Sequence, residues 1–80
     1  MSNNFIELTD DQLNALHTWA MNHRKAWKMQ LMEVWNGARR VPNYSPYLQQ
    51  IRNTLGPAWL TKVNFPELDT EKHRRSLLKK

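Results

Sequence analysis

The stretch that decides the fold is Arg24-Lys-Ala-Trp-Lys-Met-Gln-Leu-Met-Glu-Val-Trp-Asn36. On a helical wheel, Trp27, Leu31, Val34 and Ala38 fall in one narrow stripe, with the spacing of a buried helix face. This pattern predicts an amphipathic helix over residues 24–36 whose apolar side faces the core.

The opposite side of this helix carries Met29 and Met32 among Lys25 and Lys28. A solvated face normally carries polar groups, so two apolar sides predict two contacts. One interpretation is that another element of the chain covers the methionines. The other is a docking surface, because unbranched thioethers repack against varied partners. The candidate partner-binding residues are Met29, Met32, Lys25, Lys28 and Trp19, the last of which lies off the apolar stripe of the preceding helix.

Length and composition limit the class of protein. Eighty residues predict one domain, near the lower size at which an apolar core alone can stabilise a fold. The chain has no cysteine, which excludes disulfides and thiolate metal sites. Apolar runs are far shorter than the roughly 20 residues that span a bilayer, and Met1-Ser-Asn-Asn lacks a signal pattern. We expect a soluble, cytoplasmic protein without a membrane partner.

The net charge of +5 comes from 12 basic and 7 acidic side chains, and the excess is at one end. Residues 72–80 hold five basic and no acidic side chains, which leaves seven of each sign before them. We expect a helical domain over residues 1–66 and a flexible basic C-terminal tail over 67–80. Such a tail either binds phosphate or only aids solubility.

A helix start is predicted at Thr9, with Gln12 closing a capping box and Asp10 and Asp11 at the positive end of the helix dipole. His17, on the edge of this helix, is interpreted as a structural histidine. Asn22 can end the helix, but the apolar phase continues through it, so residues 10–36 form either one helix or two. We favour a break.

Gly37 then ends the second helix, and Pro42 keeps the following segment in a loop. Arg39 and Arg40 in this loop lie at a helix C-terminus, where cations are favoured. A contact with phosphate or an acidic partner is the alternative role for this pair.

Ser45-Pro46 predicts the cap and first residue of a third helix that ends at Gly56. Its polar face carries Gln49, Gln50 and Asn53, side chains that read base edges in a major groove. The eight-residue connection from Gly37 to Tyr44 is too long for a helix-turn-helix motif.

The predicted fold is an all-α bundle of three helices (about 9–22, 24–36 and 46–55) plus a short fourth helical turn (57–63). Its predicted core is Leu13, Leu16, Ala20, Trp27, Leu31, Val34, Leu48, Ile51, Leu55, Trp59 and Leu60.

The pattern Trp27-Lys28, Leu31, Trp35, then Leu48-x-x-Ile51-Arg52-Asn53-x-x-Gly56-Pro57-x-Trp59-Leu60 resembles short proteins encoded by bacteria and their phages. It covers roughly residues 8–65. No activity is attached to that group, so the resemblance implies a small accessory protein of mobile-element type and transfers no functional residues.

Catalysis finds no support in the sequence. The three histidines are scattered, no paired carboxylates remain once the helix start is explained, and two glycines cannot form a phosphate-cradling loop. We expect neither an enzyme nor a metal or cofactor.

Two binding hypotheses follow. The first is a protein-binding module that uses the methionine face to bind and modulate a host protein. The alternative is a nucleic-acid-associated module, and a homodimer is compatible with either. The candidate nucleic-acid residues are Arg39, Arg40, Gln49, Gln50, Asn53, Arg74 and Arg75.

Overall fold

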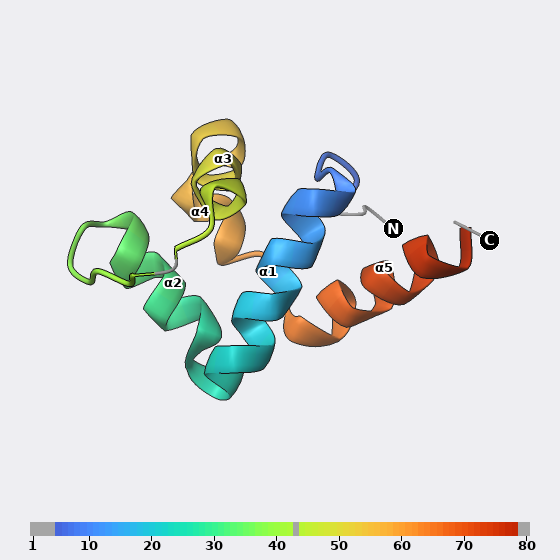
Figure 1. Cartoon of the computed structure of the whole chain (residues 1–80), viewed down its shortest axis with the longest axis horizontal. Helices are drawn as coiled ribbons and strands as arrows, with labels where there is room; N and C mark the ends of the chain where they lie inside the picture. Colours follow the sequence, from blue (N-terminus) through green and yellow to red (C-terminus); the bar gives the residue numbers. More distant parts are fainter. Residues whose placement is uncertain (1–4, 43, 79–80) are drawn as a thin grey trace.

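The computed structural model describes residues 5–42 and 44–78, and within these ranges the chain is all-α, as predicted. The elements in chain order are α1 (Asp10–His23), a 3₁₀ turn η1 (Arg24–Ala26), α2 (Trp27–Trp35), α3 (Pro46–Leu55), α4 (Pro57–Leu60) and α5 (Phe65–Leu78). Helix α1 runs through the middle, with α2, α3 and α4 on one side and α5 on the other (Figure 1).

Helix α1 begins with the predicted capping box. The backbone N–H of Gln12 donates to Thr9 Oγ1, and the backbone N–H of Thr9 donates to Gln12 Oε1, both over 3.1 Å. Two N–H groups that the helix leaves without partners are therefore satisfied before its first turn is complete.

The break between α1 and α2 is present, but it lies at Arg24 and not at Asn22. Arg24 has φ 53° and ψ −126°, and its N–H donates to the carbonyl of Ala20. The 3₁₀ turn then leads into α2 at Trp27. The chain thus changes direction while the apolar stripe on both helices continues to face the core.

Glycine ends α2 and α3, as predicted. Gly37 has φ 79°, and the N–H groups of Gly37 and Ala38 donate to the carbonyls of Val34 and Glu33, the two bonds of a Schellman motif. Gly56 has φ 83° and ψ 160°, a region open essentially to glycine alone. It separates α3 from α4, which is shorter than the predicted turn over 57–63.

The core lies where α1, α2 and α3 meet, under α4. Among the predicted core residues, Val34 and Leu55 pack against the core but are only partly buried. Six further apolar side chains are buried in the structure: Phe5, Leu8, Trp19, Trp35, Val63 and Leu68. Trp35, at the end of α2, is 4% exposed.

The predicted flexible tail over 67–80 is wrong for residues 67–78, which belong to helix α5 and pack along α1. Leu68 is fully buried in that contact, and Glu71 is 4% exposed. The sequence pattern concealed this helix because its inner face is mostly polar, so it carries no apolar stripe. Residues 79 and 80 lie outside the described ranges.

Candidate protein-binding surface

The methionines of α2 line a groove between α2 and α4, which we call the methionine groove. Its volume is about 330 Å³, and its lining residues are Lys28, Met29, Met32, Glu33, Asn36, Leu60 and Thr61. The α2 members are three or four positions apart, so they share one face of the helix. The edge of α4 forms the other wall.

Exposure differs between the two methionines. Met29 is 64% exposed, whereas Met32 is partly buried against the core. Lys28 spans the end of the groove, because its Nζ donates to the carbonyl of Val63 over 2.7 Å. Each methionine fits one of the two interpretations drawn from the sequence. An internal contact covers part of Met32, whereas Met29 stays accessible to another molecule.

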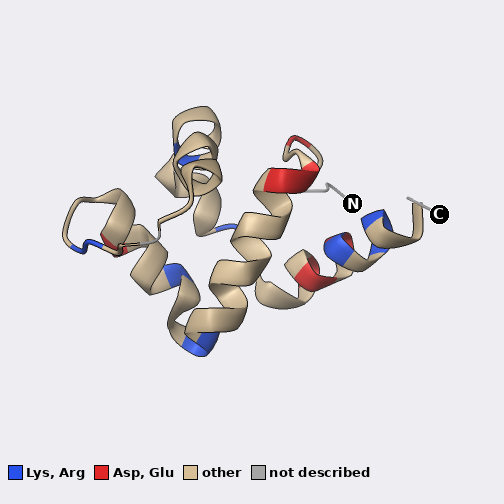
Figure 2. Cartoon of the chain, in the orientation of Figure 1, with Lys and Arg blue, Asp and Glu red and all other residues tan. Residues whose placement is uncertain are grey.

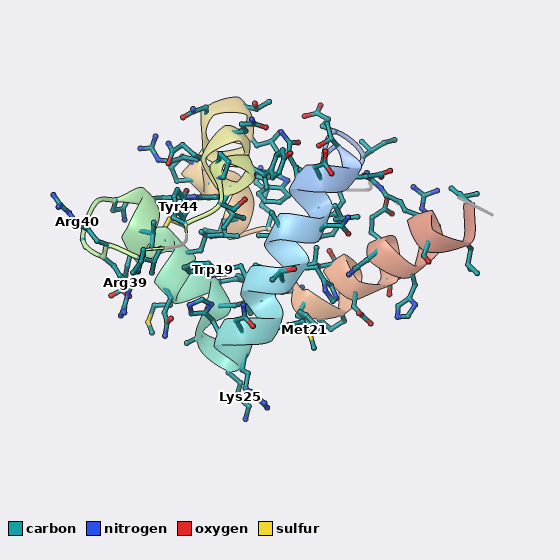
Figure 3. All side chains as sticks on the ribbon, viewed as in Figure 1. Trp19, Met21, Lys25, Arg39, Arg40 and Tyr44 are labelled. Carbon is teal, nitrogen blue, oxygen red and sulfur yellow. The ribbon has the colours of Figure 1, made fainter. Side chains whose placement is uncertain are left out.

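Trp19 does not belong to this surface. It is 7% exposed, its indole N–H donates to the carbonyl of Trp27 over 2.9 Å, and its ring stacks on His23 at 3.8 Å. The side chain lies between α1 and α2, where it supports the break (Figure 3). The wheel placed Trp19 off the stripe of α1, but the chain reversal at Arg24 brings α2 over it.

The structure forms a second groove that the sequence analysis did not identify, at the corner between α1 and α2. We call it the corner groove. Its volume is about 370 Å³, and its lining residues are Ala20, Met21, Arg24, Lys25, Trp27 and Phe65. Lys25, predicted to act beside Met29, lines this groove instead. A signal was present: Met21, like Met29, lies off its helix's apolar stripe, and it is 57% exposed.

The candidate nucleic-acid residues lie apart, and several are engaged within the chain. Arg39 pairs with Glu33 at 3.1 Å, and Arg40 is exposed farther along the loop (Figure 3). On α3, Gln49 accepts a hydrogen bond from the Tyr44 hydroxyl and donates to Asn53, while Gln50 accepts one from Gln12. The predicted polar face of α3 is therefore tied into local hydrogen bonds.

Arg75 is a structural residue. Its guanidinium donates to the carbonyls of Phe5 and Leu8 and to the carboxylates of Glu71 and Asp10, at 2.7 to 3.1 Å. Its side chain is only 15% exposed. The prediction that Arg75 lies in a flexible tail and contacts phosphate is thus replaced by a contact that holds α5 to the chain's beginning. Arg74 is 51% exposed and pairs with Glu71 from the other side.

Basic side chains form no single stripe in the described part of the chain. Figure 2 shows Lys and Arg at the α1–α2 corner, on α2, in the following loop, on α3 and on α5, and it shows acidic residues at the start of α1, near the end of α2 and on α5. A continuous basic surface is the usual electrostatic footprint of nucleic-acid binding. This distribution offers only isolated basic sites.

Titratable groups near these surfaces are held in structural contacts. Burial raises the pKa of the Tyr44 phenol, which donates to Gln49. His17 is hydrogen-bonded to Asp69 through Nε2 at 2.9 Å, and its ring lies on Phe65. In residues 5–42 and 44–78, no group of three or more His, Asp or Glu side chains is placed to hold a metal ion.

No family model, curated protein or solved structure matches this chain. Among the described helices, none has the length and apolar character needed to cross a membrane. The function therefore has to be argued from the two grooves and the charges around them.

Proposed function

We propose that this chain is a non-enzymatic protein-binding module whose contact surface is the methionine groove. The observation that carries the proposal is the exposure of Met29, 64% accessible on a helix whose opposite side buries Trp27, Leu31 and Trp35. The core needs only one apolar side of α2. The second side supports a contact with another molecule.

Two features of the groove favour a protein partner. Its walls combine thioethers with the buried Leu60, so an apolar side chain entering it meets an apolar floor. Lys28, Glu33 and Asn36 lie around that floor as polar rim groups. An apolar centre within a polar rim is the usual composition of a protein interface.

The sequence resemblance supports a setting for this activity. In a protein of phage or mobile-element type, the partner is a protein of the bacterial host, met in the cytoplasm, and binding modulates that partner. A second copy of the chain is the competing occupant of the groove, and sedimentation across a concentration series separates the two.

The test uses Met29→Glu, with Leu77→Glu as a matched control. Both residues are exposed apolar helix positions, at 64% and 69%, and Leu77 lines neither groove. We expect Met29→Glu to weaken capture of a specific partner from bacterial lysate by roughly tenfold or more, since a charge would be desolvated in the interface. Capture by Leu77→Glu should stay at the wild-type level.

Circular dichroism of both variants controls for folding, because substitution of exposed residues changes stability by only about 0.5 kcal/mol. A folded Met29→Glu variant that captures the same partner as well as wild type would refute the methionine groove. Nuclease treatment of the lysate identifies a partner that is held only through nucleic acid.

Nucleic-acid binding receives less support from the same geometry. Arg75 is committed to the fold, and Arg39 is paired with Glu33. On α3, Gln49 donates to Asn53, and Gln50 accepts from Gln12 of α1. If Arg40, Arg74 and the remaining basic side chains do bind nucleic acid, affinity must fall steeply with salt. Retardation in a low-salt gel shift that disappears at moderate salt would establish this alternative.

A further inference from the structure

The corner groove is apolar inside. Its wall includes the buried indole of Trp27 and the methylene and thioether groups of Met21, and Phe65 at the start of α5 closes one end. Figure 3 shows Met21 between the end of α1 and the start of α5. The groove exists because α1 ends, α2 begins and α5 begins at this one corner. Its volume of about 370 Å³ is within the roughly 300–1,000 Å³ range of ligand pockets.

The rim of the groove is positively charged. Arg24 and Lys25 are exposed there, and neither makes a side-chain hydrogen bond or ion pair with a residue that the structure describes. No Asp or Glu lines the groove. The nearby Asp69 of α5 is held by His17. Both cations are therefore available to a ligand that carries negative charge.

The backbone of Arg24 indicates that its side chain is not there for stability. At φ 53° and ψ −126° it has the geometry of the first central residue of a type II′ turn, a position that favours glycine. Arginine at this position strains the backbone. The exposed guanidinium has no hydrogen-bond or ion-pair partner among residues 5–42 and 44–78, so no contact there offsets the strain. A contact with another molecule accounts for the arginine better.

We propose that the corner groove receives one large apolar side chain from an acidic segment of a partner protein, with the segment's carboxylates paired to Arg24 and Lys25. Unbranched Met21 can adapt to the apolar anchor. The planar guanidinium suits a carboxylate in a bidentate pair. This inference rests on the proposed protein-binding function and adds the chemistry of a partner. It concerns a separate surface, since the two grooves share no lining residue.

The experiment selects binders from a random 12-residue peptide library against the intact 80-residue protein and locates them by NMR of labelled methionine methyl groups. Met21 reports on the corner groove, and Met29 and Met32 report on the methionine groove. We expect the selected peptides to share one large apolar residue flanked by Asp or Glu. Their addition should shift the Met21 methyl and Trp27 indole signals.

Three variants test the charges. Arg24→Glu with Lys25→Glu should weaken binding of a selected peptide by roughly tenfold or more, whereas the matched pair Arg39→Glu with Arg40→Glu changes the net charge equally and should have little effect. Arg24→Gly should raise the thermal unfolding midpoint while it weakens peptide binding several-fold. A merely structural role for Arg24 would not give opposite signs.

Several outcomes would overturn the proposal. These are a library that yields no binder, selected peptides without acidic residues, or equal loss of binding in both charge-reversed pairs. Shifts confined to Met29 and Met32 would contradict the corner groove and leave the methionine groove supported. Shifts at Met21 alone are the result expected of the corner groove and say nothing against the methionine groove. A Met21 signal that moves with protein concentration without peptide would assign the groove to a second copy.

Discussion

The two sides of α1 are attached to their neighbours by different interactions. On one side, α2 and α3 are held by fully buried aliphatic side chains such as Leu31, Leu48 and Ile51. On the other, α5 contributes one fully buried leucine, Leu68, and the partly buried Phe65, and it also docks through Arg75 and the hydrogen bond between His17 and Asp69. Apolar packing resists local opening, whereas polar contacts can exchange with water. We therefore expect α5 to open at lower free energy than α2 or α3.

The largest effect on stability should follow loss of packing on the side of α1 that contacts α2 and α3. Leu31 is fully buried, so Leu31→Ala should lower the free energy of unfolding by about 3 kcal/mol through lost transfer energy and an unfilled cavity. Urea denaturation followed by tryptophan fluorescence measures it. The control is Met29→Ala in the same helix, which should cost under about 0.5 kcal/mol. Similar losses in both variants would contradict the assignment of the buried face.

The next largest effect on stability concerns the side of α1 that contacts α5. Arg75→Ala removes one of the two arginines that pair with the buried Glu71, and it removes the guanidinium donor from the carbonyls of Phe5 and Leu8. We expect a loss of about 2 kcal/mol, below the roughly 3–5 kcal/mol seen when a fully buried pair is broken, because Arg74 remains. Amide hydrogen exchange should quicken in α5 more than in α3.

Arg74→Ala is the matched control for this variant. The two arginines are adjacent and pair with the same carboxylate, but Arg74 is half exposed, so its removal should have little effect on stability. Equal acceleration of exchange in α3 and α5 on loss of Arg75 would mean that the helices unfold together, and the contrast between the two sides would fail.

A smaller effect tests the helix that both sides share. Thr9→Ala removes the side-chain half of the capping box and should cost about 1 kcal/mol. Because α1 contacts α2, α3 and α5, exchange should quicken on both of its sides by similar factors. A response limited to one side would show that α1 does not couple them. Thr9→Ser, which keeps the hydroxyl, is the control.

The smallest effect depends on pH. The hydrogen bond from His17 lowers the pKa of Asp69 below the ordinary value of 3.8. The folded-state pKa is the lower one, so this contact stabilises the fold above pH 3.8, and its contribution is lost as pH falls through the folded value. Wild type should exceed Asp69→Asn in stability at pH 5, and the difference should vanish in stronger acid. A difference that persists there would refute this assignment.

Local signals in the sequence predicted the fold wherever a short segment determines its own structure. The capping box at Thr9, the Ser45 cap with Pro46, and the stop at Gly37 each depend on residues within a few positions. The break between α1 and α2 was predicted two residues early, since Asn22 is the better left-handed residue. Nothing local favours Arg24 in its observed conformation.

Contacts between distant segments explain what the sequence could not provide. Helix α5 was missed because its inner face is mostly polar and its partners, such as Phe5, Leu8 and His17, lie more than 50 positions away. Trp19 was assigned to a surface because the wheel of one helix does not show what the next helix covers. The sequence left open whether Met29 and Met32 are covered or accessible, because the wheel of α2 does not show what packs against its far side. In the structure Met29 is exposed and Met32 is partly buried. The corner groove needs three elements to meet, and no single wheel contains that information.

The hydrogen bond from Arg75 to the carbonyl of Phe5 joins residues 70 positions apart. It closes a loop that contains nearly the whole chain. Closing this loop costs conformational entropy before the contact can stabilise the fold. Folding from the N-terminus therefore leaves one flank of α1 in water until residue 75 has left the ribosome. During synthesis, the face of α1 that α5 covers in the folded chain is therefore open to chaperones and to aggregation.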